Sequence, residues 1–318
     1  MNLHGRDIKI FAANSNPKLA KEMSEYLGLP LGKSEVGLFS DGEISVSVYE
    51  SVRGSDVFVV QSTAAPVNRH LMELLIMIDA FKRASAGRIT AVMPYYGYAR
   101  QDRKAKGRDP ISAKLVADLL TTAGADRILT MDLHAPQIQG FFNIPVDHLV
   151  GMPTLSPYFE AKFKDRKENV VVMSPDIGSI NRARQFAQRL DLPIAIVDKR
   201  RQKANECEVM NIIGDVDGKD IIIYDDMVDT AGTLCNAALA IKAKGARSIS
   251  ACATHAVLSG PGVERIRNSP IEELVMLDTI ALPPEKQDPK IKILSCAPVF
   301  AEAIARIYSD KPISPLVN

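Results

Sequence analysis

The chain has 318 residues, enough for two domains that each bury a core of their own. Hydrophobic residues make up 46% of it and charged residues 24%, a balance that excludes a largely disordered protein. The 39 basic and 38 acidic residues nearly cancel, so overall charge attracts neither nucleic acid nor a membrane surface. No long apolar run is present and the four cysteines are widely spaced, so we expect no membrane segment and a cytoplasmic chain with reduced thiols.

Short runs rich in Val and Ile recur along the chain and predict buried parallel strands. Stretches with helical spacing lie between them, and several end in Gly, as a helix C-cap does. This alternation predicts an α/β fold with mainly parallel sheets flanked by helices. The predicted strands are 8–12, 57–61, 89–93, 128–131, 170–173, 194–197, 221–224 and 249–253, and the predicted helices are 17–27, 68–84, 112–122, 181–190 and 234–244.

The segment 35–50 departs from this pattern. Apolar residues alternate with polar ones along 44–48, directly after the turn-forming residues 40–42, which is typical of a β-hairpin. We therefore expect a hairpin that projects an aromatic ring and acidic side chains. Its tip would carry Phe39, Asp41, Gly42 and Glu43.

Arg100 and Gln101 follow the strand predicted at 89–93. An aromatic ring such as Phe39 can stack on adenine, an amide such as Gln101 can hydrogen-bond to its edge, and a guanidinium such as Arg100 can pair with a phosphate. Taken singly, each of these residues fits an ordinary surface or core position better than a binding site.

Candidate metal ligands follow two of the predicted strands. Asp132 and His134 come after 128–131, and a carboxylate beside an imidazole there can hold a divalent cation, although a lone histidine more often has a structural role. Asp176 comes after 170–173 and would face a magnesium ion at the mouth of the sheet.

Gly, Pro and Ser cluster at 151–157, after the first group of strands, and indicate a linker. We therefore predict domains at 1–150 and 151–318. The helix, small-residue turn and strand at 80–93 are similar to 237–251, which favours two similar halves, although any αβ unit produces such an echo.

Four cations lie within positions 199–203, directly after the strand predicted at 194–197. A run of charges is usually a solvated face. Beside a strand end, however, a flexible loop of this kind could close over a polyphosphate. Lys199 and Arg201 belong to this run.

The stretch 221–233 is the most informative one. An apolar strand ends in two carboxylates, and a turn of small residues follows and opens a helix. Backbone N–H groups in such a turn, two Thr hydroxyls and the positive end of the helix can bind a phosphate, while the carboxylates accept hydrogen bonds from sugar hydroxyls. Isolated carboxylates would merely end a strand and cap a helix, but their contiguity here favours a sugar-phosphate site. Its residues are Asp225, Asp226, Asp229, Thr230, Ala231, Gly232 and Thr233.

Residues 225–233 resemble the phosphoribosyl-diphosphate-binding fingerprint of phosphoribosyltransferases and ribose-phosphate pyrophosphokinases. Residues 132–142, DLHAPQIQGFF, resemble a signature of the pyrophosphokinases that transferases lack. The resemblance spans about 8–308 and is strongest to the bacterial, phosphate-dependent class. It implies two phosphoribosyltransferase-like domains, the first with the hairpin, and transfer of the diphosphoryl group of Mg-ATP to the anomeric hydroxyl of ribose 5-phosphate for nucleotide biosynthesis.

The resemblance also implies roles for the candidate residues. Lys199 and Arg201 would stabilise charge on the transferring group. Arg100, Gln101 and the hairpin tip would bind ATP, with the hairpin donated by a neighbouring subunit in a hexamer built from dimers. Asp132, His134 and Asp176 would hold Mg²⁺, and the sugar-phosphate site would take ribose 5-phosphate.

One departure from the family pattern keeps alternatives open. Ser179 stands where members have the second of two consecutive glycines, which puts the local backbone in doubt because only Gly freely adopts positive φ. A catalytically silent regulatory paralogue therefore remains an alternative. A phosphoribosyltransferase, which would use the same sugar-phosphate site without ATP, is a second alternative, although residues 132–142 and the hairpin argue against it. No residue stands out as an obligatory general base, and Asp225 and Asp226 are both candidates for that role.

Overall fold

The computed structural model describes residues 7–200 and 209–317, which form two compact units. The first unit contains the described residues up to Val150, together with Thr279–Ala281 and the residues from Ser295 onwards. The second contains Gly151–Asp278 and Leu282–Leu294.

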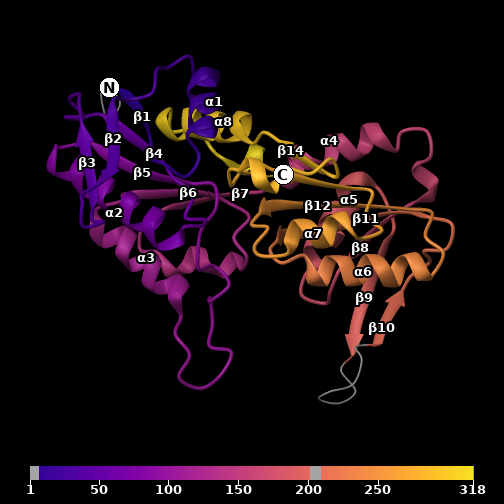
Figure 1. Cartoon of the computed structure of the whole chain (residues 1–318). Coiled ribbons are helices and arrows are strands. Elements are labelled where there is room, and N and C mark those ends of the chain that lie inside the picture. Colours follow the sequence, from indigo (N-terminus) through magenta and orange to yellow (C-terminus); the bar gives the residue numbers. More distant parts are fainter. Residues whose placement is uncertain (1–6, 201–208, 318) are drawn as a thin grey trace. The chain divides into compact units, whose positions relative to one another are not determined.

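A five-stranded parallel sheet forms the centre of the first unit (Figure 1). Its central strands are rich in Val and Ile and are buried at every residue, as expected for strands covered on both faces. The strands, in spatial order, are β1 (Ile8–Ala12), β4 (Asp56–Val60), β5 (Arg88–Met93), β6 (Arg127–Met131) and β7 (Val146–Leu149). The connecting helices are α1 (Pro17–Leu27), α2 (Val67–Arg83), α3 (Ser112–Ala123) and the 3₁₀ helix η1 (Pro136–Phe141).

The predicted hairpin is confirmed as a separate two-stranded sheet of β2 (Ser34–Leu38) and β3 (Ile44–Val48). Val36, Val46 and Val48 pack against the core of the first unit. Alternation along β3 thus anchors the stem of the hairpin.

The second unit has a seven-stranded sheet, parallel except for its first strand. Its strands, in spatial order, are β10 (Val209–Ile213), β9 (Ile194–Arg200), β8 (Val170–Ser174), β11 (Asp220–Val228), β12 (Ser248–Ala256), β13 (Glu273–Leu277) and β14 (Ile291–Leu294). Its helices are α4 (Met152–Lys162), α5 (Ile180–Leu190), α6 (Gly232–Ala243), α7 (Gly262–Arg267), η2 (Lys167–Asn169) and η3 (Pro284–Lys286).

The two units are built on the same plan. The order β1-β4-β5-β6-β7 in the first repeats as β8-β11-β12-β13-β14 in the second, and α1, α2 and α3 occupy the same places in the chain as α5, α6 and α7. An ion pair with a buried aspartate also recurs at the start of the second of these strands. Arg88 Nε donates to Asp56 at 3.0 Å in the first unit, and Arg247 Nε donates to Asp220 at 2.9 Å in the second. The predicted pair of similar α/β domains is therefore confirmed.

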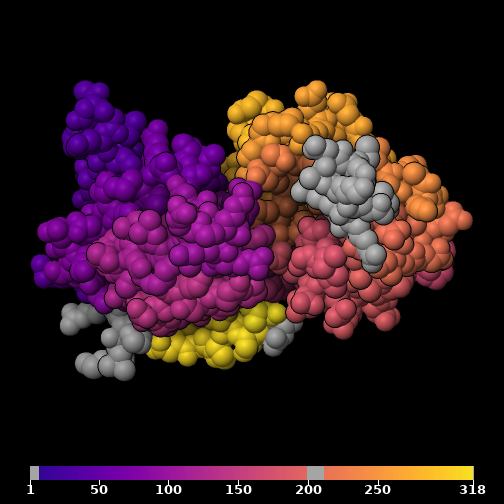
Figure 2. Space-filling model, turned by 90° about the horizontal axis from the view of Figure 1, so that it is seen from below, coloured from indigo at the N-terminus to yellow at the C-terminus, as the bar shows by residue number. Residues whose placement is uncertain are grey.

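The last helix corrects the predicted limits of the second domain. Helix α8 (Ala297–Tyr308) follows β14 but packs in the first unit beside α1, as Figure 1 shows, and the short η4 (Ser314–Leu316) comes after it. Arg88 Nη2 of β5 donates to the Ile307 carbonyl of α8 at 3.1 Å. In Figure 2 the yellow C-terminal segment lies along the magenta surface of that unit. The stretch 151–318 is therefore not one domain, because its last residues, from Ser295 onwards, belong to the first unit.

Helix α4 shows the reverse arrangement. It follows β7 of the first unit and packs in the second, against α5 and β13. Since α1 and α5 are equivalent, each unit's first helix is covered by the helix that follows the other unit's last strand. None of the helices in the described part of the chain has the length and apolar character that a membrane span requires.

Candidate active site

The two carboxylates of the sugar-phosphate stretch lie inside a strand. Strand β11 continues through Asp225 and Asp226 to Val228, whereas its neighbour β8 pairs with it only as far as Ile223. The other neighbour, β12, is equally long and pairs Asp225 with Ala253. The prediction that the strand ends at the carboxylates was therefore wrong, because pairing with β12 extends it.

Asp225 lies in a largely buried polar cluster. Its Oδ1 accepts hydrogen bonds from Ser179 Oγ at 2.8 Å and from the Asp226 backbone N–H at 2.9 Å. Burial, reinforced by the neighbouring Asp226 charge, raises the pKa of Asp225 to about 8. Asp226 is only 4% exposed and is paired with Arg182 of α5, whose Nη1 lies 2.9 Å from Asp226 Oδ1. Arg182 therefore balances part of the negative charge of these two carboxylates.

The turn after β11 has the geometry of an anion site. Ala231 adopts the left-handed conformation, with φ of +59°, and α6 begins at Gly232. Cys235 donates its backbone N–H to the Ala231 carbonyl at 2.9 Å and so starts the helix. The N-cap residue, Ala231, makes no side-chain hydrogen bond to this helix start. The first N–H groups of α6 and the partial positive charge of its N-terminus thus suit a phosphate.

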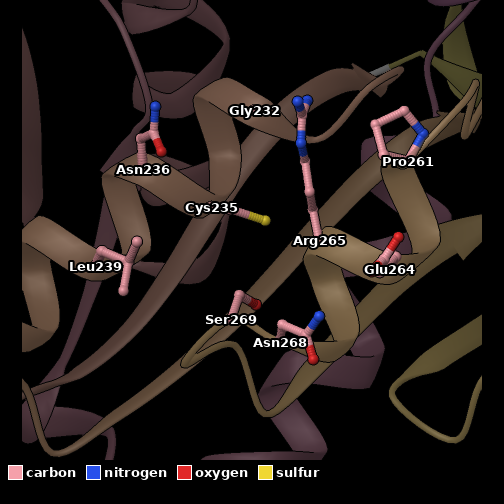
Figure 3. Close-up of a pocket in the computed structure, with 9 residues that line it drawn as sticks. All are labelled: Gly232, Cys235, Asn236, Leu239, Pro261, Glu264, Arg265, Asn268 and Ser269. Carbon is pink, nitrogen blue, oxygen red and sulfur yellow. The ribbon is translucent and has the colours of Figure 1, made fainter.

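Helix α7 supports this turn from behind. Arg265 Nη1 donates to the Thr230 carbonyl at 2.9 Å, and Figure 3 shows the side chain reaching from α7 towards Gly232. Gly262, at the start of α7, approaches so closely that a Cβ there would lie 2.7 Å from the Asp229 carbonyl oxygen. Further along, an open groove of about 500 Å³ separates α6 from α7. The support of the turn escaped sequence reasoning, because α7 comes some thirty residues later.

The loop after β8 joins Asp176 to the same cluster. Asp176 Oδ1 accepts the Ser179 backbone N–H at 2.9 Å, and its carbonyl accepts the Ser174 hydroxyl at 2.6 Å. Ser179 has a φ of −90°, an ordinary right-handed conformation. The doubt raised by the missing glycine was therefore unfounded, since this position does not need a positive φ.

The hairpin tip is exposed in the first unit. Phe39 is 58% exposed, and the Glu43 backbone N–H donates to Asp41 Oδ1 at 3.1 Å. Gly42 has a φ of +93°, which explains the glycine in this turn. The predicted aromatic and acidic tip is thus formed, with the Phe39 ring available to a planar ligand.

Arg100 and Gln101 lie in the connection between β5 and α3. The Gln101 carboxamide oxygen accepts a hydrogen bond from the Ser112 hydroxyl, and its backbone carbonyl accepts the Ala113 N–H at 3.2 Å. Both residues are exposed. Gln101 is therefore held at the start of α3 with its amide nitrogen directed by that contact.

The predicted metal ligands belong to different units, Asp132 and His134 to the first and Asp176 to the second. In residues 7–200 and 209–317 no three His, Cys, Asp or Glu side chains gather into a metal site. Mg²⁺ usually takes only one or two protein carboxylates and keeps water or substrate phosphates as its other ligands. The oxygen donors of Asp132 in the first unit and of Asp176 in the second each suit such an ion, and a complete protein cage is not required.

The predicted cationic loop begins later than expected. The backbone of Lys199 belongs to β9, where it pairs with Met210 of β10. Strand pairing therefore extends three residues past the predicted end at Val197. Arg201 lies outside the described residues.

Comparison with known proteins gives a consistent result. Residues 8–124 match the N-terminal domain of ribose phosphate pyrophosphokinase, and residues 200–318 match the phosphoribosyl synthetase-associated domain. The ribose-phosphate pyrophosphokinase of Clostridium perfringens is 67% identical over 316 residues, 99% of each chain. That of Caldanaerobacter subterraneus is 65% identical over 316 residues, also 99% of each chain.

A solved structure agrees with these relatives. The phosphoribosylpyrophosphate synthetase from Mycobacterium smegmatis is 43% identical and superposes with a TM-score of 0.91, covering 96% of this chain and 100% of that one. Similarity of this extent includes both units and the site described above. The chain is therefore an enzyme of the ribose-phosphate pyrophosphokinase family.

Proposed function

We propose that this enzyme transfers the diphosphoryl group of Mg-ATP to the anomeric hydroxyl of ribose 5-phosphate, giving phosphoribosyl diphosphate and AMP for nucleotide biosynthesis in the cytoplasm. The observation that carries the proposal is the junction of β11 and α6, where two carboxylates precede a turn of small residues and the start of a helix. This junction offers hydrogen-bond acceptors for sugar hydroxyls beside donors for a phosphate.

Ribose 5-phosphate would bind in the second unit. The backbone N–H groups and hydroxyls of residues 229–233 would hold its phosphate, and the carboxylates of Asp225 and Asp226 would accept hydrogen bonds from its vicinal hydroxyls. The pairing of Arg182 with Asp226 balances part of the negative charge there. The sugar would thus be oriented at both ends.

ATP would bind to residues of the first unit. Phe39 would stack on the adenine, Gln101 would hydrogen-bond to its edge, and Arg100 would pair with a phosphate. Asp41, Gly42 and Glu43 would complete the contact from the hairpin tip. We further propose that the hairpin serves a neighbouring subunit, in dimers that assemble into a hexamer.

In the reaction, the anomeric oxygen attacks the β-phosphorus of ATP. The bond between the β-phosphorus and the α,β-bridging oxygen breaks, the bridging oxygen leaves with AMP, and the hydroxyl proton is released. Positioning and charge neutralisation are the main contributions expected of the protein. Lys199 and Arg201 would stabilise the charge on the group in transfer.

Asp132, His134 and Asp176 would hold Mg²⁺, which when bound neutralises charge on phosphate oxygens. Ser179 does not weaken this proposal, because its ordinary φ leaves the Asp176 loop unstrained. The geometry thus gives no reason to regard the chain as a silenced paralogue.

The test is turnover of the purified enzyme with ATP, ribose 5-phosphate and Mg²⁺, followed by ³¹P NMR with and without inorganic phosphate. AMP and phosphoribosyl diphosphate should appear in equal amounts, and Lys199→Ala should reduce their formation at least a hundredfold. A wild-type enzyme that stays inert with phosphate supplied would refute the proposal.

A further inference from the structure

We propose that the Ser179 hydroxyl is a positioning group of the sugar-phosphate site, which fixes the Asp225 carboxylate in the orientation that accepts a sugar hydroxyl. The inference rests on the proposed function and assigns to Ser179 a role in the affinity for ribose 5-phosphate.

Ser179 links the loop that follows β8 to the adjacent strand β11. Its backbone N–H donates to Asp176 Oδ1 at 2.9 Å, and its hydroxyl donates to Asp225 Oδ1 at 2.8 Å. The residue is only 5% exposed and lies directly before α5, so the packing of that helix restricts its movement. A hydroxyl held in this way defines where the carboxylate oxygen must lie.

Two hydrogen bonds to the Asp225 side chain end on the same oxygen. Ser179 Oγ and the Asp226 backbone N–H meet at Oδ1 from two directions and so fix the plane of the carboxylate. We assign the other oxygen, Oδ2, to the sugar hydroxyl. Without the serine, the carboxylate would lose one of the two hydrogen bonds that fix its plane and would rotate more easily.

The Arg182 guanidinium lies closer to Asp226 than to Asp225. Arg182 Nη1 is 4.0 Å from Asp225 Oδ1 but 2.9 Å from Asp226 Oδ1. Ser179 donates to Asp225 at hydrogen-bond distance, and this donation favours the ionised form of the carboxyl, which burial and the Asp226 charge oppose.

A glycine here, as in the family pattern, would keep the N–H bond to Asp176 but would lack the hydroxyl bond to Asp225. The chain thus carries a donor that members with two glycines do not have. It follows that Ser179→Gly should reproduce the effect of Ser179→Ala, since both remove the same hydrogen bond.

The experiment measures ribose 5-phosphate binding by calorimetry, together with KM and kcat, for the wild type and the Ser179→Ala, Ser179→Gly and Ser179→Thr variants. Ala and Gly should each raise Kd and KM for ribose 5-phosphate about tenfold, as expected for loss of a hydrogen bond to a charged group. The KM for ATP should change less than about twofold, and Thr, which keeps the hydroxyl, should stay within about threefold of the wild type.

Ser174→Ala is the matched control, because it removes another serine hydroxyl bond from the same loop, to the Asp176 carbonyl. Unchanged affinity in Ser179→Ala or Ser179→Gly would overturn the inference, and so would an equal loss in Ser174→Ala, which would indicate only a loosened loop. A wild type that binds no ribose 5-phosphate would instead refute the proposed function, so the two failures are distinguishable.

Discussion

At the scale of single residues, Asp225 has the most distinctive chemistry. Its pKa of about 8 lies well above the usual range of a carboxyl, because the group is buried beside Asp226. Between about pH 4 and pH 8 the folded protein therefore retains a proton that the unfolded chain releases. The stability contributed by this group is present at low pH and is lost as the pH rises through 8.

We predict that Asp225→Asn will be more stable than the wild type at pH 8, by about 3 °C or more in Tm, because an uncharged amide removes the cost of ionisation while its oxygen still accepts the Ser179 bond. The gap should shrink at pH 5. Thermal unfolding at both pH values is the measurement. A gap that stays constant or widens towards pH 5 would contradict the raised pKa.

Much of this site could be predicted from sequence because its parts are contiguous. Residues 225–233 contain the carboxylates, the small-residue turn and the helix start in one run. Arg182 and the Ser179 hydroxyl could not be placed in the same way, since they reach the carboxylates from another strand and helix. Only folding brings those segments together.

At the scale of elements, α7 is a support for the phosphate turn. We predict that Arg265→Ala will raise the KM for ribose 5-phosphate about fivefold, because the Thr230 carbonyl loses its donor and the turn loosens. Stability should hardly change, since Arg265 is exposed. Steady-state kinetics and thermal unfolding of the variant would test this.

Arg267→Ala provides the control on the same helix. Arg267 is also exposed but pairs with Asp288, at 2.8 Å, and does not contact the turn. Its loss should leave the KM for ribose 5-phosphate unchanged. Equal effects of the two substitutions would mean that α7 acts through its charge and not through the Thr230 contact.

Periodicity located most of the longer elements but not their ends. Strand β9 continues to Arg200 because it pairs with β10, and β11 continues to Val228 because it pairs with β12. Such extensions depend on pairing with the neighbouring strand. They cannot be recognised from the polar residues that continue the strand. Short edge strands such as β7 and β14 escaped notice for the same reason.

At the scale of the whole molecule, the exchanged helices make each unit depend on a segment that follows the other. We predict that Phe300→Ala in α8, which empties a fully buried position, will destabilise the first unit by about 3–5 kcal/mol. Hydrogen exchange should then rise in α1 and β1, not in β13 and β14, which directly precede α8 in sequence.

Phe159→Ala in α4 is the mirror experiment. Phe159 is buried and packs edge-on against Phe186 of α5, so exchange should rise in the second unit. If exchange instead rose in β6 and β7, which precede α4, the assignment of the two helices would be wrong. Apolar spacing can predict that a helix has a buried face, but it does not show which unit covers that face. For this reason the predicted second domain, 151–318, wrongly included the last helix.

The central claim is that an intact diphosphoryl group moves from ATP to ribose 5-phosphate. The most direct measurement uses ATP labelled with ³²P at the β-phosphate, incubated with the enzyme, ribose 5-phosphate and Mg²⁺, and separates the products by chromatography. We predict that all transferred label will appear in phosphoribosyl diphosphate and that the AMP will be unlabelled. Label appearing in ADP, with only a single phosphoryl group transferred, would contradict this account.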